Sequence, residues 1–332
     1  MNNLDKNATI LVAGGGGFIG GHLVKSLLKQ GYKNVRSVDC KPFSQWYQRF
    51  PDVDNRVLDL RGLDHCLEAV NGCDVVYNLA ADMGGMGFIE NNKALCMLSV
   101  LINTHLLMAG RQIGIHTFFY ASSACVYAGY KQKETDIPGL KEGDAYPADP
   151  EDGYGWEKLF SERMCRHFYE DFGIVCHPVR FHNVYGPFGT WDGGREKAPA
   201  AICRKVLIAK KTGNHNIEIW GDGLQTRSFM YIDDCIEGMQ RLMNKKVTIP
   251  INLGSSEMVS INQLVDYAES IVGIKLKRHY NLDAPKGVRG RSSDNTLINE
   301  KIGWEPATTL REGLEVTCKW IEEQMDSGAD SL

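Results

Sequence analysis

Short apolar runs alternate with amphipathic helical segments through the first half of this chain, and no other feature restricts its fold as much. Each run is rich in β-branched residues and nearly continuous, which is typical of parallel strands covered by helices on both faces. Residues 20–30 and 94–111, which lie between such runs, carry apolar residues at helical spacing. The pattern therefore predicts an α/β fold with a doubly wound parallel sheet. The predicted strands are residues 9–13, 34–39, 56–60, 75–79, 117–121 and 175–180.

The character of the sequence changes after residue 180. Loops rich in glycine, proline and lysine over residues 183–199 lead to a helical segment and then to short helical and strand-like pieces. A chain of 332 residues is long enough for two joined parts. We therefore expect a Rossmann-type domain, residues 1–180 plus about 226–255, and a smaller C-terminal α/β lobe, about residues 181–225 plus 256–326.

Composition and charge exclude several classes of partner. A net charge of −4 argues against a surface for nucleic acid or a polybasic membrane anchor. No apolar run approaches membrane-spanning length and the polar start carries no secretory signal, so we expect a cytoplasmic protein without a membrane partner. Ten cysteines without a C-x-x-C pair predict reduced, mostly buried thiols, and nine histidines without ligand spacing predict no metal site.

A glycine-rich segment follows the first predicted strand and opens the first predicted helix. Gly14, Gly17 and Gly20 form the pattern G-x-x-G-x-x-G. Glycines at these positions let the backbone turn tightly and approach a pyrophosphate, whose charge is met by the helix N-terminus. A glycine-rich turn without a ligand is the alternative. The position between strand and helix favours a dinucleotide site.

Asp39 ends the second predicted strand, where a carboxylate can bind the ribose diol of the adenosine. A carboxylate also repels a 2′-phosphate, so Asp39 favours NAD over NADP, although the neighbouring Lys41 weakens that preference. Residues at the ends of the third and fourth strands could contribute, or could serve as structural caps. The predicted NAD site comprises Gly14, Gly17, Phe18, Ile19, Gly20, Asp39, Asp59, Leu79 and Ala80.

Tyr154 and Lys158 stand four residues apart in a predicted helix, so they share one face. The Lys158 ammonium would lower the pKa of the Tyr154 phenol, which could then take a proton from a sugar hydroxyl as hydride leaves the carbon. Both residues would also contact the cofactor. Ser122 or Ser123 would hydrogen-bond the same hydroxyl. Cys125 adds a thiol that titrates near neutrality when positive charge is close and that simple hydride transfer does not need.

With the glycine loop, an Asn-Leu-Ala-Ala segment, the serines and Tyr-x-x-x-Lys in this order, the chain resembles the extended short-chain dehydrogenase/reductase superfamily, whose members often act on nucleotide sugars. Within it, the chain is similar to the GDP-mannose 3,5-epimerase family. The resemblance covers nearly the whole chain and implies an NAD-dependent isomerase that acts on GDP-mannose and forms a homodimer through helices of the cofactor domain. It rests on residues 80–88, 120–127, 180–191, 193–201 and 220–229.

The resemblance also implies the chemistry. Transient oxidation at C4 of the hexose acidifies the C–H bonds at C3 and C5, and inversion then needs a base on one face and an acid on the other. The resemblance assigns these roles to Cys125 and Lys197. The alternatives are a buried core thiol and a solvated loop lysine. Arg195 would depress the pKa of Lys197, and Glu196 would oppose that effect or bind a sugar hydroxyl.

Charged side chains in the C-terminal half are candidates for the substrate diphosphate, although each alone is more often a surface residue. Two glycines would allow the backbone to approach the hexose, unless they belong to a plain loop. Two rival functions remain: another nucleotide-sugar 4-epimerase or 4,6-dehydratase, and a non-catalytic NAD(H) sensor or scaffold. The predicted substrate site comprises Gly84, Gly85, Ser123, Asn183, Glu196, Lys197, Lys205, Gln225, Arg227, Arg289 and Arg291.

Overall fold

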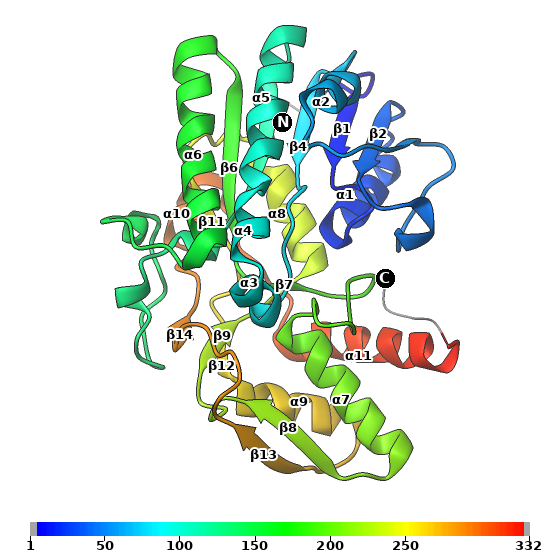
Figure 1. Cartoon of the computed structure of the whole chain (residues 1–332), viewed down its shortest axis with the longest axis vertical. Helices are drawn as coiled ribbons and strands as arrows, with labels where there is room; N and C mark the ends of the chain where they lie inside the picture. The colour runs from blue at the N-terminus through cyan, green and yellow to red at the C-terminus, as the bar shows by residue number, and fades with distance from the viewer. Residues whose placement is uncertain (1–4, 329–332) are drawn as a thin grey trace.

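A computed structural model describes residues 5–328 and contains a seven-stranded parallel sheet with the strand order β11-β6-β5-β4-β1-β2-β3 (Figure 1). The order reverses between β1 and β4, the place where open α/β sheets bind ligands at the carboxyl ends of their strands. This sheet confirms the predicted fold class. Its strands are β1 (Ile10–Ala13), β2 (Val35–Asp39), β3 (Asp54–Val57), β4 (Val75–Asn78), β5 (Thr117–Ser123), β6 (Val175–Phe181) and β11 (Ile251–Leu253).

Two apolar clusters cover the two faces of the sheet. Neighbouring strand residues belong to different clusters, for example Ile10 and Leu11, because successive side chains of a strand point to opposite faces. The first cluster includes residues of α1 and α8, and the second includes residues of α2, α5 and α6. The helices concerned are α1 (Phe18–Lys29), α2 (Leu63–Val70), α5 (Ser99–Ile113), α6 (Asp152–Phe172) and α8 (Ile232–Asn244).

Two predicted elements have different bounds in the structure. The third strand was placed at residues 56–60 but begins at Asp54, whose carboxylate pairs with Arg36 at 2.7 Å and with Arg56 at 2.8 Å. The observed edge strand is mostly polar. The prediction followed the apolar residues within 56–60 and therefore placed the strand too late in the sequence. The single helix predicted over residues 94–111 is interrupted at Leu98, between α4 (Lys93–Met97) and α5. A further helix, α3 (Met86–Asn91), precedes α4.

The stretch Lys93–Ile113 corrects the expectation about apolar runs. Its length of 21 residues and mean hydropathy of 1.4 are sufficient, by length and composition only, to cross a membrane. Only 39% of its most apolar window is buried inside the chain. A core helix of a soluble protein can pass the same test, so the finding itself is weak. It does show an apolar helical surface that the rest of the chain leaves open.

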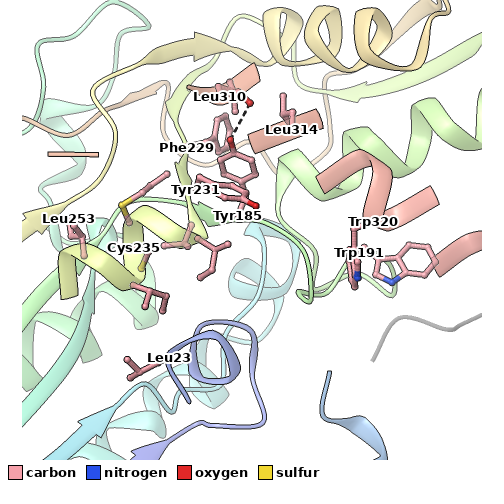
Figure 2. Packing of buried hydrophobic residues seen from close by; sticks show 14 of the residues in the cluster. Leu23, Tyr185, Trp191, Phe229, Tyr231, Cys235, Leu253, Leu310, Leu314 and Trp320 are labelled. Atoms are coloured by element: carbon pink, nitrogen blue, oxygen red, sulfur yellow. Dashed lines mark hydrogen bonds between the residues drawn. The ribbon is translucent and has the colours of Figure 1, made fainter. Parts of the chain in front are cut away.

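The C-terminal half contributes a lower region with helices on one side of small sheets (Figure 1). The cluster on the α1 side of the main sheet continues into this region (Figure 2), where Tyr185 donates a hydrogen bond to the Leu310 carbonyl at 3.2 Å. Its elements are α7 (Ala198–Thr212), α9 (Ile261–Val272), α11 (Leu310–Asp326), β7 (Val184–Tyr185), β8 (Asn216–Trp220), β9 (Thr226–Ser228), β10 (Met230–Tyr231), β12 (Met258–Ser260), β13 (Lys277–Asn281) and β14 (Gly290–Arg291).

The division into two domains stays a prediction. The short helix α10 (Thr296–Ile302) was assigned to the smaller lobe but packs beside β11 at the edge of the main sheet. One apolar cluster also joins both parts. Relative motion of the two parts would therefore have to disrupt a shared core.

A disulfide joins Cys203 in α7 to Cys318 in α11, although the two cysteines are 115 residues apart. The expectation that all ten cysteines are reduced is therefore wrong. Of the eight free cysteines, only Cys40 is exposed. Among residues 5–328, no group of three or more His, Cys, Asp or Glu side chains is arranged to hold a metal ion.

Candidate active site

The glycine-rich loop joins β1 to α1 in a conformation that requires glycine. Gly14 has φ +82°, and a Cβ there would lie 2.9 Å from the Ala80 nitrogen. A Cβ on Gly20 would lie 2.1 Å from the Gly14 carbonyl oxygen. Gly17 is the N-cap of α1 and no side chain caps that helix end. The uncapped N-terminus of α1 thus offers backbone amides and a helix dipole, which fit the pyrophosphate of a dinucleotide.

The neighbouring strand ends bring most of the other predicted cofactor residues to this loop. Asp39 ends β2, is 9% exposed and accepts a hydrogen bond from the Lys41 amide at 3.0 Å. The Leu79 amide donates to the Ala13 carbonyl at 3.0 Å, so Leu79 and Ala80 lie against the loop. Phe18 and Ile19 begin α1 and pack against the core.

Asp59 differs from the other predicted cofactor residues. Its carboxylate pairs with Arg61 at 2.6 Å and is exposed. The Arg61 guanidinium holds the pKa of that carboxyl below its usual range. Asp59 therefore has a partner within the chain, and its contact with the cofactor stays a prediction.

Helix α6 brings Tyr154 and Lys158 together, as their spacing predicted. Both side chains are buried, and the Lys158 ammonium lies 5.6 Å from the centre of the Tyr154 ring. The same ammonium lies 3.5 Å from the Glu157 carboxylate and 4.9 Å from the centre of the Tyr120 ring. Tyr120 in turn donates to Glu157 at 3.0 Å. A buried carboxylate thus balances the charge of Lys158.

The predicted lowering of the Tyr154 pKa is wrong for the protein alone. Burial raises the pKa of the Tyr154 phenol well above its usual value, and negative charge on Cys125 and Glu157 raises it further. A hydrogen bond with Ser123 acts in the opposite direction. Desolvation therefore outweighs the nearby Lys158.

The structure separates the two serine candidates. Ser122 Oγ donates to Glu162 at 2.5 Å, and the same carboxylate accepts bonds from Arg180 at 2.7 and 2.8 Å. These three groups are buried, so Ser122 belongs to a structural network. Ser123 instead accepts from the Cys125 amide at 3.2 Å and hydrogen-bonds the Tyr154 phenol. Ser123 is therefore the serine positioned to share a substrate hydroxyl with Tyr154.

Cys125 lies in a short 3₁₀ turn (Ala124–Val126) directly after β5. Arg291 Nη1 lies 3.5 Å from the Cys125 sulfur, and Arg291 Nη2 lies 2.7 Å from Glu151. Burial raises the pKa of the Cys125 thiol and Glu151 raises it further, whereas Arg291 lowers it. Positive charge is close, as predicted, but titration near neutrality is not supported because burial dominates.

Lys197 is the N-cap of α7. Burial lowers the pKa of its ammonium, and negative charge on Cys125 acts in the opposite direction, so the two side chains are close enough to interact. Neither flanking residue is among the causes of this pKa shift, and binding of a sugar hydroxyl by Glu196 stays a prediction. Arg195 pairs with Asp82 at 2.7 Å, and Glu196 pairs with Arg204 at 3.0 Å. Desolvation, and not the charge of Arg195, tunes Lys197.

Gly84 and Gly85 approach another part of the chain. The Gly85 amide donates to the Arg195 carbonyl at 3.0 Å, and a Cβ on Gly85 would lie 2.4 Å from the Glu196 carbonyl oxygen. A Cβ on Gly84 would lie 2.9 Å from Phe88. These contacts explain both glycines by the packing of the segment before Lys197. An approach to the hexose stays a prediction.

Four of the remaining substrate candidates come from the paired strands β9 and β14 or the residues beside them. Arg227 and Arg291 are in register on these strands. Gln225 donates to the Trp220 carbonyl at 2.7 Å, Arg289 pairs with Asp222 at 2.9 Å, and Arg227 donates to the Val288 carbonyl at 2.6 Å.

Two candidates lie outside this strand pair. Lys205, in α7, donates to the Glu218 carbonyl at 2.9 Å, and burial lowers the pKa of its ammonium. Asn183 follows β6 at φ +40° and donates to the Ser228 carbonyl at 3.0 Å. Each candidate thus has a partner within the chain.

Comparison with known proteins identifies the family of this chain. The model of the NAD dependent epimerase/dehydratase family matches residues 10–254. The chain belongs to this family. The match supports an enzyme with NAD as its cofactor, as the sequence predicted.

Named relatives are close in sequence. GDP-mannose 3,5-epimerase 1 of Oryza sativa subsp. japonica is 49% identical over 318 residues, which cover 96% of this chain and 82% of the relative. GDP-mannose 3,5-epimerase of Arabidopsis thaliana is 48% identical over 322 residues, with 97% and 84% coverage. These matches confirm the resemblance stated from the motifs.

Solved structures share the fold. UDP-glucose 4-epimerase from Thermotoga maritima, solved with UDP-glucose, has a TM-score of 0.85 at 24% identity and covers 96% of this chain and 99% of its own. UDP-glucuronic acid 4-epimerase from Bacillus cereus, in complex with UDP-glucuronic acid and NAD, has a TM-score of 0.80 at 26% identity, with 95% and 99% coverage.

Sequence reasoning missed three residues beside the proposed acid/base groups. Glu151 and Gln132 contact Arg291 across 140 and 159 residues of sequence, so no local pattern indicates them. Glu157 precedes Lys158 directly. Its position next to Lys158 in the sequence would have been the available signal.

Proposed function

We propose that this protein is a GDP-mannose 3,5-epimerase that converts GDP-D-mannose to GDP-L-galactose, with GDP-L-gulose as the product of inversion at C5 alone. The observation that carries the proposal is the placement of Cys125, whose thiol packs in one buried cluster with Tyr154 and whose amide donates to Ser123 Oγ at 3.2 Å. The charge of Lys197 acts on the same thiol. Hydride transfer at C4 needs no further acid or base. A second proton-transfer pair is what inversion at carbon requires.

The residues of α6 and β5 would act at C4. Tyr154 takes the proton of the C4 hydroxyl and later returns it, and Ser123 hydrogen-bonds the same oxygen. Lys158, balanced by Glu157, holds its ammonium 5.6 Å from the centre of the Tyr154 ring, while burial keeps the phenol protonated in the protein alone. Bound NAD would supply a reversible hydride acceptor and the positive charge of its oxidised nicotinamide. The hydride returns to C4, so the overall reaction has no net redox change.

Cys125 and Lys197 would act at C5 and C3. A ketone at C4 makes the hydrogens on both neighbouring carbons acidic. One of the two residues removes a proton from the carbon while the other delivers a proton to the opposite face. The Cys125 thiol and the Lys197 amine then exchange protons with solvent between cycles. Each inversion then breaks one C–H bond and forms one.

The cations around β9 and β14 would bind the diphosphate. Arg227 is nine-tenths buried, so its charge is little screened by water, whereas the charge of Arg291 is already paired with Glu151. Burial lowers the pKa of Arg227 to about 10. An anionic ligand would offset the cost of burying the Arg227 guanidinium.

Proton NMR of GDP-mannose in deuterated water tests the proposal. The wild-type protein should incorporate deuterium at C3 and C5 and produce galactose and gulose signals. Loss of both signals in Cys125→Ala and in Lys197→Ala would support the two roles. A product lacking the C6 oxygen would support a 4,6-dehydratase. Inversion at C4 alone would support a 4-epimerase. The absence of turnover with any nucleotide sugar would support a sensor or scaffold.

We also propose a homodimer that forms through α5 and α6. These two helices pack side by side (Figure 1) and leave a hollow of about 280 Å³ with an almost entirely apolar lining. Soluble monomers rarely expose a continuous apolar surface of this kind. A second copy of the same face would cover it. The exposed apolar residues on this face include Leu95 and Met97 of α4, Leu98 and Leu101 at the start of α5, and Trp156 and Phe160 of α6.

Sedimentation velocity tests this interface. Phe160→Glu places a charge on the face and should give monomers at micromolar concentration. Leu282→Glu is the matched control, because Leu282 is equally exposed, at 57% against 55% for Phe160, but lies in the lower region. A wild-type monomer, or a dimer that survives Phe160→Glu, would contradict the proposal.

A further inference from the structure

The guanidinium of Arg291 uses each of its three nitrogens inside the chain. Nε donates to Gln132 Oε1 at 2.6 Å, Nη1 approaches the Cys125 sulfur at 3.5 Å, and Nη2 donates to Glu151 Oε2 at 2.7 Å. Arg291 is 4% exposed. A side chain held at three points has one orientation, and that orientation directs positive charge at the Cys125 sulfur.

Glu151 contacts both Cys125 and Arg291. It is the N-cap of α6, and its amide donates to the Cys125 carbonyl at 2.9 Å. Its carboxylate is 13% exposed and pairs with Arg291. One residue therefore contacts the backbone of Cys125 and also the cation that faces the Cys125 sulfur. Glu151 lies only three positions before Tyr154.

Among the groups around Cys125, Glu151 is distinguished by its negative charge. Two cations, Arg291 and Arg227, and the amine of Lys197 interact with the thiol. Tyr154 and Cys96 also face it but are uncharged at neutral pH because burial raises the pKa of each. Glu151 is the carboxylate with the largest effect on Cys125. Without it, the neighbouring positive charges would favour the thiolate.

We propose that Glu151 is a positioning residue for Cys125: its carboxylate anchors Arg291 against the sulfur, and its negative charge offsets the guanidinium so that Cys125 rests as a thiol. The inference deepens the proton-transfer role of Cys125 and rests on it. It can be tested without substrate, so its failure is distinguishable from failure of the proposed reaction.

The test is the rate of alkylation of Cys125 by iodoacetamide between pH 6 and pH 10, measured on the NAD-bound protein by mass spectrometry of the Cys125 peptide. The reagent reacts with the thiolate. Glu151→Gln keeps an oxygen that can accept from Arg291 but removes the charge. We expect the thiol pKa to fall by about one unit, which makes alkylation about tenfold faster below that pKa.

Two further variants give the expected contrast. Arg291→Gln removes the cation, so alkylation should become slower than in the wild type. Asp149→Asn is the matched control, because Asp149 is an exposed carboxylate two residues before Glu151. Its alkylation profile should coincide with that of the wild type. A purely structural role of Glu151 would not make alkylation of Cys125 faster in Glu151→Gln and slower in Arg291→Gln.

An unchanged profile in Glu151→Gln, or a shift in the same direction as Arg291→Gln, would overturn the inference. If Glu151→Gln does not fold, as judged by circular dichroism and NAD content, Gln132→Glu serves instead. That variant places a second carboxylate on Arg291 Nε and should slow alkylation. Unchanged or faster alkylation in a folded Gln132→Glu protein would then overturn the proposal.

Discussion

Cys125 and Lys197 are proposed to exchange protons with the same hexose, yet the chain holds them in different ways. Cys125 lies among charged partners, with Arg291 at 3.5 Å from its sulfur and Glu151 behind that arginine. Lys197 is a helix N-cap whose ammonium makes no hydrogen bond within residues 5–328. Desolvation is the largest influence on the pKa of both groups, but the charges of Glu151 and Arg291 also act on the thiol. Substitutions nearby should affect the first residue more than the second.

Removing either group should give the largest effect. Cys125→Ala and Lys197→Met each delete one partner of the proton-transfer pair, so deuterium entry at C3 and C5 should fall by about 100-fold to 10,000-fold. Transient reduction of bound NAD, followed at 340 nm, should persist because Tyr154 and Ser123 remain. Lys197→Arg should be as inactive as Lys197→Met, since a guanidinium does not deprotonate. An active Lys197→Arg protein would contradict a base role for Lys197.

The buried ion pair of Glu162 and Arg180 should be more costly to remove than an exposed ion pair of α6. Glu162→Gln leaves the buried guanidinium of Arg180 without its counter-ion, although the amide oxygen can still accept from Ser122. We expect a loss of about 3–5 kcal/mol in the free energy of unfolding, measured with urea. Glu170→Gln removes the partner of Arg166, an exposed ion pair of the same 2.7 Å length, and should change stability little. Equal effects of the two variants would contradict this account.

The two halves of the site also differ in how far the sequence predicts them. The glycine loop and the pair Tyr154 and Lys158 depend on contacts over a few residues, so spacing alone placed them together. The third strand was misplaced because its residues pair through Arg36 and Asp54 instead of through apolar side chains. The Cys203–Cys318 disulfide was missed because it joins helices that are distant in sequence.

Charge partners were the least predictable feature. Arg195 stands two residues before Lys197, and proximity in sequence suggested that it tunes the amine. The backbone instead directs Arg195 toward Asp82, 113 residues away. Arg291 was predicted as a free donor for the diphosphate, but in the structure it faces Cys125, Glu151 and Gln132. Sequence distance does not indicate which charges meet once the chain is folded.

Lys197 and Cys125 should contribute slopes of opposite sign to the pH dependence of the free energy of unfolding. Burial lowers the pKa of folded Lys197 below its usual 10.5, so the unfolded chain binds the extra proton and the wild type gains stability as pH rises toward 10.5. The stability advantage of Lys197→Met over the wild type should therefore shrink as pH rises. The full difference is about 1.4 kcal/mol for each unit by which the pKa is lowered.

Cys125 should show the opposite slope. Burial raises the pKa of its folded thiol above 9.0, so the unfolded chain loses the proton first and the wild type loses stability above pH 9.0. The stability of Cys125→Ala relative to the wild type should therefore rise with pH. Urea unfolding at pH 7, 8, 9 and 10 measures both differences. Slopes of the same sign would contradict the contrast between the two residues.

The smallest effect is expected for Arg195→Gln. If the charge of Arg195 depressed the pKa of Lys197, removing it would move the pH midpoint of deuterium exchange upward. Arg195 is 47% exposed at its side chain and pairs with Asp82 at 2.7 Å, so its charge is screened and already balanced. The pH midpoint should therefore stay where it is in the wild type, while Glu151→Gln shifts the midpoint of the Cys125-dependent limb downward. An upward shift in Arg195→Gln would mean that neighbouring charge governs both residues, and the distinction between a desolvated amine and a charge-balanced thiol would fail.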